Sequence, residues 1–400
     1  MVVHIYPESP SRLPDTPAHD LSCEALPDPV PGWLLRAGLG LHAALGVLGR
    51  WLSPPERAVI GHCADAGFLY VLHALVLGGV PDLLGEAPLG AAELAERAGL
   101  DRDALFRTLR GSAAKGFFRL LRDGRFEHTA RSRALRSGHP SGSREFLLYF
   151  CSGSNLGAWG RFDHALRTGG SPFEKVHDVG VWEWFDRHPD ERETFARAMM
   201  GLSAADAPVI AKLYPFQKMK KVCDVGGGRG TLLSELLLRH PHLEGVLYER
   251  PNVLPSAKVL LEARGVLNRV ELIAGDFFER VPCGADGYLL SNILHDWDDA
   301  QCMRILRNVR AASQASRVLI IETLLDPMSR NPVGIAKDLQ MMVACAGGRE
   351  RSATEFGALI HASGLRQCGR YEYPTLGIIE AVPALTSVPA RPTLHSAATR

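Results

Sequence analysis

The sequence lacks any cysteine pattern that would hold a zinc ion or form a disulfide framework. Its eight cysteines are scattered over 400 residues, with no CxxC pair and no Cys/His cluster at the spacing of a zinc site. Several stand in apolar runs, which is typical of packed, reduced thiols in a cytosolic protein. We therefore expect a cytoplasmic protein without a metal site.

An excess of charge of either sign is also absent. The chain has 45 lysines and arginines against 44 aspartates and glutamates, for a formal net charge of +1 at pH 7. Proteins that attract nucleic acids or anionic membranes by their overall field carry a strong positive excess, so neither partner is expected. A hydrophobic share of 46% and a charged share of 22% are ordinary for a soluble chain of two or three domains.

A secretory signal and a clean membrane span are missing as well. The N-terminus, MVVHIYPESPSRLPDTP, has no basic start followed by an apolar run and a small-residue cleavage site. The longest apolar stretch, residues 32–52, is interrupted by Arg36, His42 and Arg50 and has leucines near helical spacing. We predict a packed or dimer-forming amphipathic helix here, with a helix on a membrane surface as the alternative.

Composition divides the chain into five segments. Residues 1–31 are rich in proline and residues 384–400 in Ala, Ser, Thr and Pro, so we expect both ends to be disordered. Residues 32–140 are predicted to form a helical and winged-helix dimerisation domain, residues 141–215 a helical connector, and residues 216–383 an α/β domain. No internal repeat is found.

The winged helix is predicted from the order of its elements. Two short helices are separated by Gly99, and Asp101 is placed to cap the second. A short strand, Asp123-Gly124 and a second strand then form a wing. Arginines of the second helix and the wing would suit DNA, but nearby acidic residues offset them, so dimerisation is preferred and DNA binding is the alternative.

Large apolar side chains are concentrated between residues 141 and 210. Such a density indicates a pocket for a flat ligand, although core packing is the simpler role for any one of these residues. The residues that we expect to line the pocket are Phe146, Trp159, Phe162, Trp184 and Met199.

From residue 219 to residue 382 strands alternate with helices. The expected strands are KKVCDVG, GVLYER, VELIAGD, GYLLSNIL (287–294), RVLIIETLL and finally residues 371–382. This alternation predicts a mostly parallel, doubly wound, Rossmann-like sheet. Ligands of such sheets bind outside the carboxyl ends of the strands, where the strand order reverses.

A glycine-rich turn, DVGGGRG, ends the first of these strands and opens a helix over residues 231–238. Gly226, Gly228 and Gly230 allow the backbone to turn sharply and to approach a ligand. Glu249 ends the second strand, where its carboxylate could accept both hydroxyls of a ribose.

The same pairing suits NAD, but two further residues favour a different cofactor. Asp224 lies inside the turn, where it would repel a pyrophosphate but could bind an amino or sulfonium group. Asp276 ends the third strand, and Phe277 follows it, which places a carboxylate and an aromatic ring for an adenine. Three acidic strand ends therefore favour a cationic ligand.

With these motifs the chain resembles the S-adenosylmethionine-dependent O-methyltransferases, a family that includes plant caffeic acid enzymes, animal hydroxyindole enzymes and bacterial natural-product tailoring enzymes. The resemblance covers residues 60–382 and rests on DVGGGRG, Glu249-Arg250-Pro251, GDFFE, LHDW and GGRERSATEF. It implies S-adenosylmethionine as cofactor and a homodimer acting on a small aromatic acceptor. The residues implied to bind the cofactor are Asp224, Gly226, Gly228, Gly230, Glu249, Asp276, Phe277 and Ser291, the last in place of a lysine of plant members.

The resemblance also implies a catalytic group. His295 follows an apolar strand and would be the general base, with Glu322 and Glu350 flanking it so that either could fix its tautomer. Asn292 and Asp296 are expected to contact the acceptor, and Asp296 could instead cap the next helix. The asparagine of the plant acceptor motif near Met199 is lost, so the bacterial tailoring branch is the closer match.

Two other functions fit the same elements. One is a winged-helix transcription regulator whose Rossmann-like half senses a ligand. The other is an enzyme that binds S-adenosylmethionine but catalyses a reaction other than methyl transfer. The presence of His295 with both glutamates favours methyl transfer.

Overall fold

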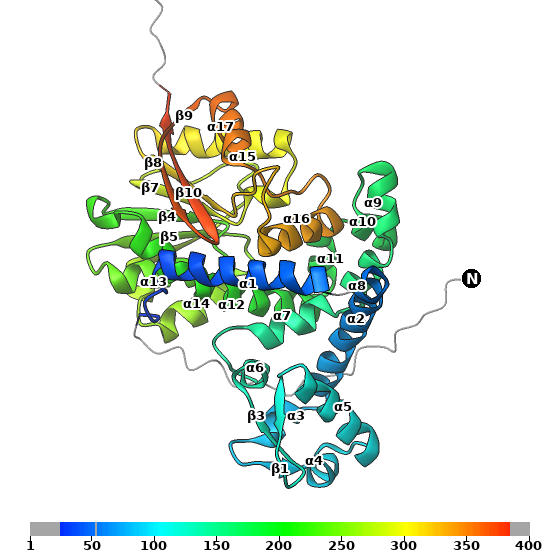
Figure 1. Ribbon diagram of the computed structural model, residues 1–400. Coiled ribbons are helices and arrows are strands. Elements are labelled where there is room, and N and C mark those ends of the chain that lie inside the picture. Colours follow the sequence, from blue (N-terminus) through cyan, green and yellow to red (C-terminus); the bar gives the residue numbers. More distant parts are fainter. Residues whose placement is uncertain (1–24, 53, 385–400) are drawn as a thin grey trace, which may run out of the picture.

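The computed structural model describes residues 25–52 and 54–384 (Figure 1). The predicted disordered ends therefore fall mostly outside the described residues. Residues 25–31 are placed, and they lie against helix α13 (Thr231–Arg239). There the backbone N–H of Leu26 donates to the buried Glu235 at 3.0 Å, and Glu235 also pairs with Arg239 and Arg264.

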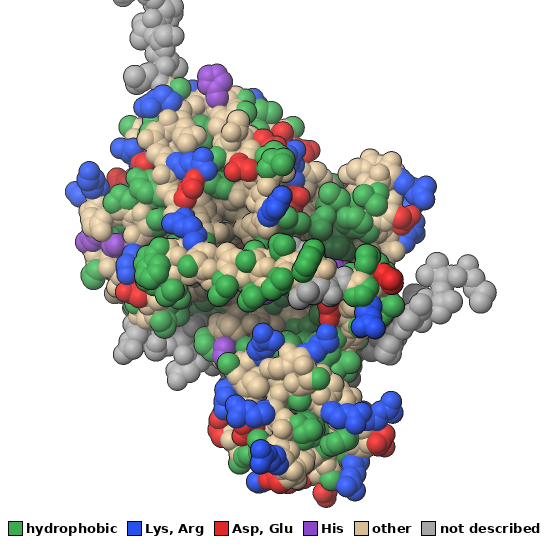
Figure 2. Space-filling model, in the orientation of Figure 1, with side chains coloured by type: hydrophobic (Ala, Val, Ile, Leu, Met, Phe, Trp, Pro, Cys, Tyr) green, Lys and Arg blue, Asp and Glu red, His purple; other side chains and the backbone are tan. Residues whose placement is uncertain are grey.

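Two long apolar helices follow, α1 (Gly32–Leu52) and α2 (Pro55–Leu77). The helix predicted over residues 32–52 is present, but it is not packed against the rest of the described chain as one of the two expectations required. Nearly all described side chains of α1 are exposed, Trp51 by 81% and Leu41 by 63%, and Figure 2 shows a band of apolar side chains along the front of the molecule where α1 runs. By length and mean hydropathy alone, Gly32–Gly49 of α1 and all of α2 would also suffice to cross a membrane.

The winged helix has the predicted order of elements. Gly99 ends α4 in the left-handed conformation, and the Asp101 side chain caps α5 by accepting the backbone N–H of Ala104 at 2.8 Å. Strand β3 pairs antiparallel with β2 and also with β1, a short strand that the sequence did not indicate. The elements are α3 (Val80–Leu84), β1 (Leu89–Gly90), α4 (Ala91–Ala98), α5 (Arg102–Ala114), β2 (Phe118–Leu120), β3 (Arg125–His128) and α6 (Ala130–Arg133).

The connector is helical, as predicted. Its last and longest helix, α12, packs against α7 on one side and against α13 of the α/β half on the other. The helices are α7 (Ser143–Phe150), α8 (Gly153–Trp159), α9 (Phe162–Thr168), α10 (Pro172–His177), α11 (Val181–Arg187) and α12 (Pro189–Leu213). The connector therefore borders the sheet domain directly.

The C-terminal half contains a seven-stranded sheet in the order β6-β5-β4-β7-β8-β10-β9. The strands from β6 to β8 are parallel, while β10 is antiparallel to both β8 and β9, so the predicted mostly parallel sheet is confirmed. The strands are β4 (Lys221–Val225), β5 (Glu244–Glu249), β6 (Val270–Ala274), β7 (Gly287–Ser291), β8 (Arg317–Glu322), β9 (Leu365–Tyr373) and β10 (Leu376–Pro383).

Helices cover both faces of this sheet (Figure 1). A core of buried apolar side chains lies on each face, one shared with α15 and α17 and the other with α13 and α14. After α13, the helices are α14 (Leu254–Ala263), α15 (Asp299–Ser313), α16 (Pro332–Ala344) and α17 (Ala353–Ala362). The chain runs outward from β4 to β6 and then returns to β7 beside β4, which makes the carboxyl ends of β4 and β7 the point where strand order reverses.

Two strand predictions need correction. The strand expected over residues 287–294 ends at Ser291, because Asn292 adopts a positive φ of 52° and Leu294–Asp296 form a single 3-10 turn, η3. The last expected strand, residues 371–382, is instead a hairpin of β9 and β10. The exposed, polar edge strand β9 shows no apolar run, which is why the sequence pattern revealed mainly β10.

Candidate active site

The turn after β7 presents His295 and is held on both sides by buried charged groups. Glu322, at the end of β8, accepts the backbone N–H groups of Ile293 and Leu294 at 3.1 and 2.9 Å. The buried guanidinium of Arg351 donates to the carbonyl oxygens of Leu294 and Trp297 at 2.9 and 2.8 Å. Hydrogen bonds to the backbone of this turn therefore help to fix the position of His295.

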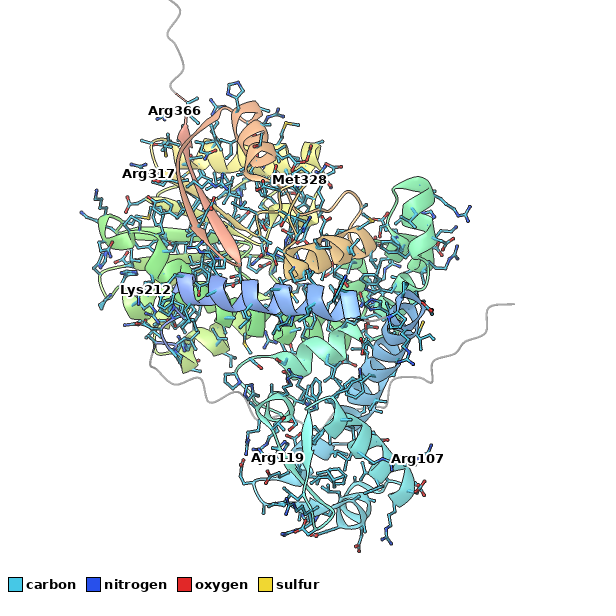
Figure 3. The ribbon with its side chains drawn as sticks, viewed as in Figure 1. Arg107, Arg119, Lys212, Arg317, Met328 and Arg366 are labelled. Atoms are coloured by element: carbon cyan, nitrogen blue, oxygen red, sulfur yellow. The ribbon has the colours of Figure 1, made fainter. Side chains whose placement is uncertain are left out.

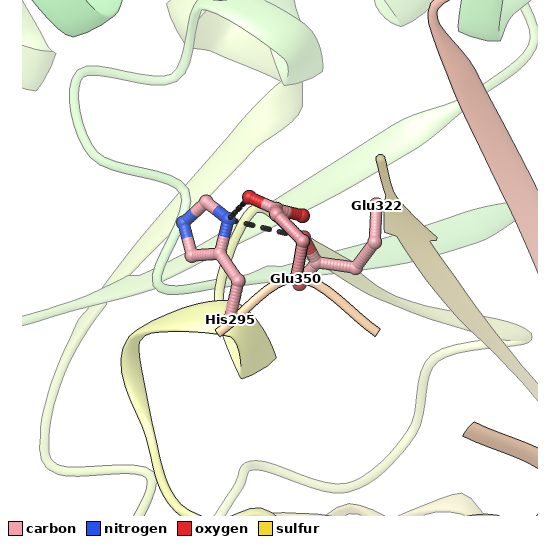
Figure 4. A group of neighbouring side chains, drawn as sticks. All are labelled: His295, Glu322 and Glu350. Atoms are coloured by element: carbon pink, nitrogen blue, oxygen red, sulfur yellow. Dashed lines mark hydrogen bonds and ion pairs between the residues drawn. The ribbon is translucent and has the colours of Figure 1, made fainter. Parts of the chain in front are cut away.

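Both predicted glutamates reach the same nitrogen of His295. Nδ1 lies 3.0 Å from Glu350 Oε1, in hydrogen-bond geometry, and 3.4 Å from Glu322 Oε2 (Figure 4). All three side chains are buried. The sequence left open which glutamate fixes the ring, and the structure assigns the hydrogen bond to Glu350, while Glu322 mainly holds the backbone of the turn.

The charged groups around the imidazole have opposite effects on the pKa of His295. Burial and the ammonium of Lys337 lower the pKa of His295, but the carboxylates of Glu322, Asp296 and Glu350 outweigh them, so this pKa is raised above its usual value. Burial also acts on Glu350, but Lys337 and His295 reverse its effect and lower the pKa of that carboxyl. Glu350 is therefore a carboxylate that accepts the Nδ1 proton of the imidazole.

Lys337 was missed in the sequence. It extends from α16, and its ammonium donates to Asn292 Oδ1 at 2.7 Å and to Thr323 Oγ1 at 3.3 Å, and lies 3.3 Å from Glu350 Oε1. A lysine in an amphipathic helix has the same sequence signature whether it faces solvent or a site, so no motif could have identified it. The side-chain oxygen of Asn292, a residue expected to contact the acceptor, accepts this hydrogen bond from Lys337.

One imidazole and two carboxylates form a compact donor set. The ligand atoms of His295, Glu322 and Glu350 lie within 4.8 Å of one another. Divalent cations accept such a composition, but here Lys337 supplies a positive charge opposite the carboxylates and the imidazole Nδ1 forms a hydrogen bond with Glu350. The chemistry of the cluster can therefore be derived from side chains alone.

Asp296 lies on the other side of the ring. Its Oδ1 is 3.4 Å from His295 Nε2 and accepts a weak hydrogen bond from the Cys345 thiol at 3.7 Å. Asp298, and not Asp296, caps helix α15, by accepting the backbone N–H of Gln301 at 2.8 Å. The alternative of Asp296 as a helix cap is thus excluded, and its carboxyl, with a pKa raised by burial, belongs to the site.

The glycine turn lies at the reversal point beside this turn. Gly226, Gly228 and Gly230 all have left-handed φ values, of 69°, 56° and 81°. A Cβ on Gly226 would come within 2.7 Å of Ile293 Cδ1, so the glycine also lets the two turns approach each other. The carboxylate of Glu249 accepts the backbone N–H of Gly228 at 2.9 Å and so lies against the glycine turn.

Asp224 is the feature that best suits a cationic cofactor. The residue is buried, and its Oδ2 has no hydrogen-bond partner among the described residues. Burial, with a smaller effect of Glu249, raises the pKa of this carboxyl to about 7. A buried acceptor without a partner is costly unless a ligand satisfies it, which the amino or sulfonium group of S-adenosylmethionine would do.

The remaining predicted cofactor residues follow the neighbouring strands. Asp276 comes two residues after β6, is exposed, and its Oδ1 accepts the backbone N–H of Phe278 at 2.7 Å. The ring of Phe277 meets that of Trp297 edge to face at 6.2 Å. Ser291 ends β7 and is half-buried. All three occupy the carboxyl edge of the sheet, as expected from the strand order.

An aromatic cluster connects the connector with the catalytic turn. Trp182 stacks on Trp297 with ring centroids 6.3 Å apart and meets Phe195 at 5.8 Å, and Phe195 meets Tyr149 at 5.1 Å. Trp182 Nε1 is buried without a hydrogen-bond partner among the described residues. No sequence pattern distinguishes Trp182, Phe195 or Tyr149 from the other aromatic residues of the connector, because the contacts between these rings and with Trp297 depend on how α7, α11 and α12 pack.

Four of the five predicted pocket residues pack together, and the fifth, Phe146, is partly exposed. Trp159, Phe162, Trp184 and Met199 pack in one cluster with Tyr149 and Cys345, and Trp159 Nε1 donates to Gln340 of α16 at 2.9 Å. Trp184 stacks on His188 at 3.7 Å. Phe146 is 37% exposed and meets the ring of Tyr149 edge to face at 6.5 Å and that of Phe150 at 6.2 Å.

Comparisons with known proteins agree with this arrangement. Residues 159–366 match the family described as the O-methyltransferase domain. Over 297 residues the chain is 39% identical to the mitomycin biosynthesis 6-O-methyltransferase of Streptomyces lavendulae, covering 74% of this chain and 84% of that protein. The solved mitomycin 7-O-methyltransferase has a TM-score of 0.76 and 36% identity, covering 82% and 98% of the two chains.

A third comparison includes ligands. The O-methyltransferase of neocarzinostatin biosynthesis, solved with S-adenosylmethionine and 2-hydroxy-5-methyl naphthoic acid, has a TM-score of 0.68 and 30% identity, covering 79% of this chain and 95% of that one. The two solved structures cover 82% and 79% of this chain.

Proposed function

Because the chain belongs to the S-adenosylmethionine-dependent O-methyltransferase family, we propose that its acceptor is a hydroxyl group of a small aromatic or polyketide-like natural product, and that His295 removes the proton of that hydroxyl. The observation that carries the proposal is the hydrogen bond between His295 Nδ1 and Glu350. It holds one ring nitrogen and leaves Nε2, which points away from both glutamates in Figure 4, to receive a proton.

The cofactor fits the glycine turn and its acidic neighbours. We assign Asp224 to its amino group, Glu249 to its ribose, and Asp276 and Phe277 to its adenine. The three glycines of the turn and Ser291 would lie beside the bound cofactor. When bound, S-adenosylmethionine supplies a methyl group on a positively charged sulfur that is open to in-line displacement. The chain's own task is to align the acceptor and to take up its proton.

The proton transfer follows from the geometry of the ring. A phenol with a pKa of about 10 is mostly protonated at neutral pH, so the hydroxyl must lose its proton as it attacks. His295 accepts this proton at Nε2, and the resulting imidazolium is stabilised by Glu350 at Nδ1. Asp296, 3.4 Å from Nε2, lies where it can orient the hydroxyl, and the aromatic cluster that includes Trp159, Phe162, Trp184 and Met199 suits a flat acceptor.

The function is tested by incubating the protein with S-adenosylmethionine and hydroxylated aromatic and polyketide acceptors, each paired with its O-methylated analogue. Mass spectrometry should show one added methyl group on the free hydroxyl and none on the blocked analogue. Cofactor consumed with an acceptor that is altered in another way would favour the non-methylating enzyme instead.

The pH dependence of the reaction should respond to Glu350. Only the neutral imidazole accepts a proton, so the rate falls as the pH drops through the raised pKa of His295. In Glu350→Gln the side-chain oxygen still accepts the Nδ1 proton, but the charge that raises this pKa is lost. We expect the acidic limb of kcat/KM to move to lower pH by about one unit. A limb that moves to higher pH, or not at all, would contradict the role of Glu350.

We also propose that the protein is a homodimer built through its N-terminal helices. Exposed apolar side chains are concentrated on α1 and the first turns of α2, where they include Trp33, Leu41, Leu45, Trp51, Val59 and Ile60. A second copy would cover this surface, which is continuous with the winged-helix half.

Two charges placed on this surface should separate the protomers. In Leu41→Arg/Leu45→Arg each arginine would have to be buried without a partner, so we expect a monomer in light scattering where the unmodified protein is a dimer. Leu166→Arg, on the exposed side of α9, is the matched control and should remain dimeric. A monomeric unmodified protein that sediments with lipid vesicles would favour a membrane-surface role for α1.

A nucleic-acid partner is not part of the proposal. In the winged helix Arg107, Arg119 and Arg125 pair with Asp103, Glu127 and Asp123 at 3.7, 2.9 and 2.7 Å, which offsets part of the exposed positive charge. Arg107 and Arg119 also extend from different sides of the domain in Figure 3. The seven described cysteines are free thiols, which supports the proposed cytoplasmic location.

A further inference from the structure

The ammonium of Lys337 joins four segments that surround the catalytic turn. From α16 it reaches Asn292 after β7 at 2.7 Å, Thr323 after β8 at 3.3 Å, and Glu350 in the loop before α17 at 3.3 Å. Its side chain is 27% exposed and is therefore largely enclosed by these partners. A lysine in this position costs desolvation energy, which its three acceptors offset.

Lys337 and His295 share one oxygen atom. Glu350 Oε1 accepts the imidazole Nδ1 proton at 3.0 Å and also faces the Lys337 ammonium at 3.3 Å. Two cations that face one carboxylate oxygen compete for it, so the ammonium weakens the hold of Glu350 on a protonated imidazole. The same lysine fixes Asn292, whose positive φ of 52° starts the turn that carries His295.

The charges that face His295 show why such a competitor matters. Three carboxylates surround the ring, Asp296 from η3, Glu322 from β8 and Glu350 from the loop after α16. Their negative charge favours the protonated imidazole, and a protonated imidazole cannot act as a base. The other titratable or charged groups near the cluster are Tyr149 on α7, Asp206 on α12, Asp338 and Cys345 at α16, and Arg351.

We propose that Lys337 is a positioning residue for methyl transfer, whose ammonium shares Glu350 Oε1 with His295 and so keeps the imidazole in its proton-accepting form. The inference rests on the proposed role of His295 as the base. Lys337 itself touches neither the acceptor nor the cofactor in this mechanism. Its direct effect is on the charge and orientation of Glu350, and through Glu350 on the ring.

The test compares three variants of the full-length protein. Lys337→Met keeps the length of the side chain and removes its charge, Lys337→Arg keeps the charge, and Lys212→Met removes a surface lysine far from the site (Figure 3). The His295 ring is titrated by NMR in the ligand-free protein, with its signals assigned by their loss in His295→Ala. The acidic limb of kcat/KM is measured in parallel.

We expect Lys337→Met to raise both the NMR pKa and the kinetic limb by about one pH unit, which leaves about tenfold less neutral imidazole below the limb. Lys337→Arg should restore most of the shift, and Lys212→Met should show none. An unchanged or lowered NMR pKa in Lys337→Met would overturn the proposal. Because NMR needs no turnover, failure to find a methylated product would count against the proposed function and not against this inference.

A double variant covers the case in which Lys337→Met does not fold. In Glu350→Gln the shared oxygen carries no charge, so removing the charge of Lys337 should have a smaller effect on the pKa of His295. With Glu350 intact, the reference shift is the difference in the NMR pKa of His295 between Lys337→Arg and Lys337→Met. If Lys337 acts through Glu350, adding Lys337→Met to Glu350→Gln should shift this pKa by less than half of that difference. Where Lys337→Met alone is unfolded, the shift in the double variant should stay below about half a unit. A full one-unit shift in the Glu350→Gln background would show that Glu350 is not the intermediary and would overturn the proposal.

Discussion

His295→Ala should lower kcat for methyl transfer by about 10²- to 10⁴-fold, the usual contribution of a positioned general base. The loss falls on kcat because the acceptor can still bind against the aromatic cluster, while its hydroxyl proton no longer has an acceptor. His295 is buried and its partners are fixed by the backbone of the catalytic turn, so the alanine variant should keep the fold. The measurement is steady-state kinetics with an acceptor found in the initial screen.

Two further results make this prediction specific. Binding of S-adenosylhomocysteine should be unchanged in His295→Ala, because the glycine turn and Glu249 are separate from the imidazole. The loss should shrink at high pH, where a phenolic acceptor ionises without help. A variant with nearly full activity at neutral pH would show that another group, with Asp296 as the first candidate, takes up the proton.

Glu249→Ala should weaken S-adenosylmethionine binding at least about 100-fold. Two hydrogen bonds from ribose hydroxyls to a carboxylate contribute about 1.5 to 3 kcal/mol each, and their loss corresponds to that factor or more. The substitution also removes the oxygen that accepts the backbone N–H of Gly228 at 2.9 Å, which loosens the glycine turn. Calorimetric titration with S-adenosylmethionine, S-adenosylhomocysteine and NAD measures the effect directly.

Glu249→Gln is the matched control for this variant. It preserves the shape of the side chain and one acceptor oxygen, so we expect a smaller loss of affinity, between those of the unmodified protein and the alanine variant. Thermal unfolding without ligand should be similar for both variants. Tight binding of S-adenosylmethionine to Glu249→Ala would show that the ribose is held elsewhere, and the assignment of the second strand end would have to be abandoned.

The main elements of the fold could be predicted because each leaves a local pattern. The alternation of apolar strands with helices predicted the parallel sheet, and the glycine turn after β4 predicted the ligand edge, since carboxyl ends of parallel strands meet where the order reverses. Gly99 and Asp101 marked the ends of the two helices of the winged helix. The predictions that failed lay where the backbone departs from a regular pattern, at Asn292 and along the polar edge strand β9.

The candidate site was predicted in part for the same reason. His295, Glu322 and Glu350 stand in short motifs at strand ends and loops, so their convergence could be anticipated, and the distances between them agree with it. Trp182 and Tyr149 could not be selected, because each is one of many aromatic residues in a helical segment. Only the packing of α7, α11 and α12 decides which of these rings approach Trp297.

By itself the sequence determined the class of the protein and the edge of the sheet at which its chemistry occurs, because periodicity, glycine turns and caps act over a few neighbouring residues. The tertiary structure decided which glutamate bonds His295 and that Lys337 shares the oxygen of Glu350. These contacts join residues far apart in the chain. Their distances depend on how helices pack on the sheet, and a side chain's type does not record that packing.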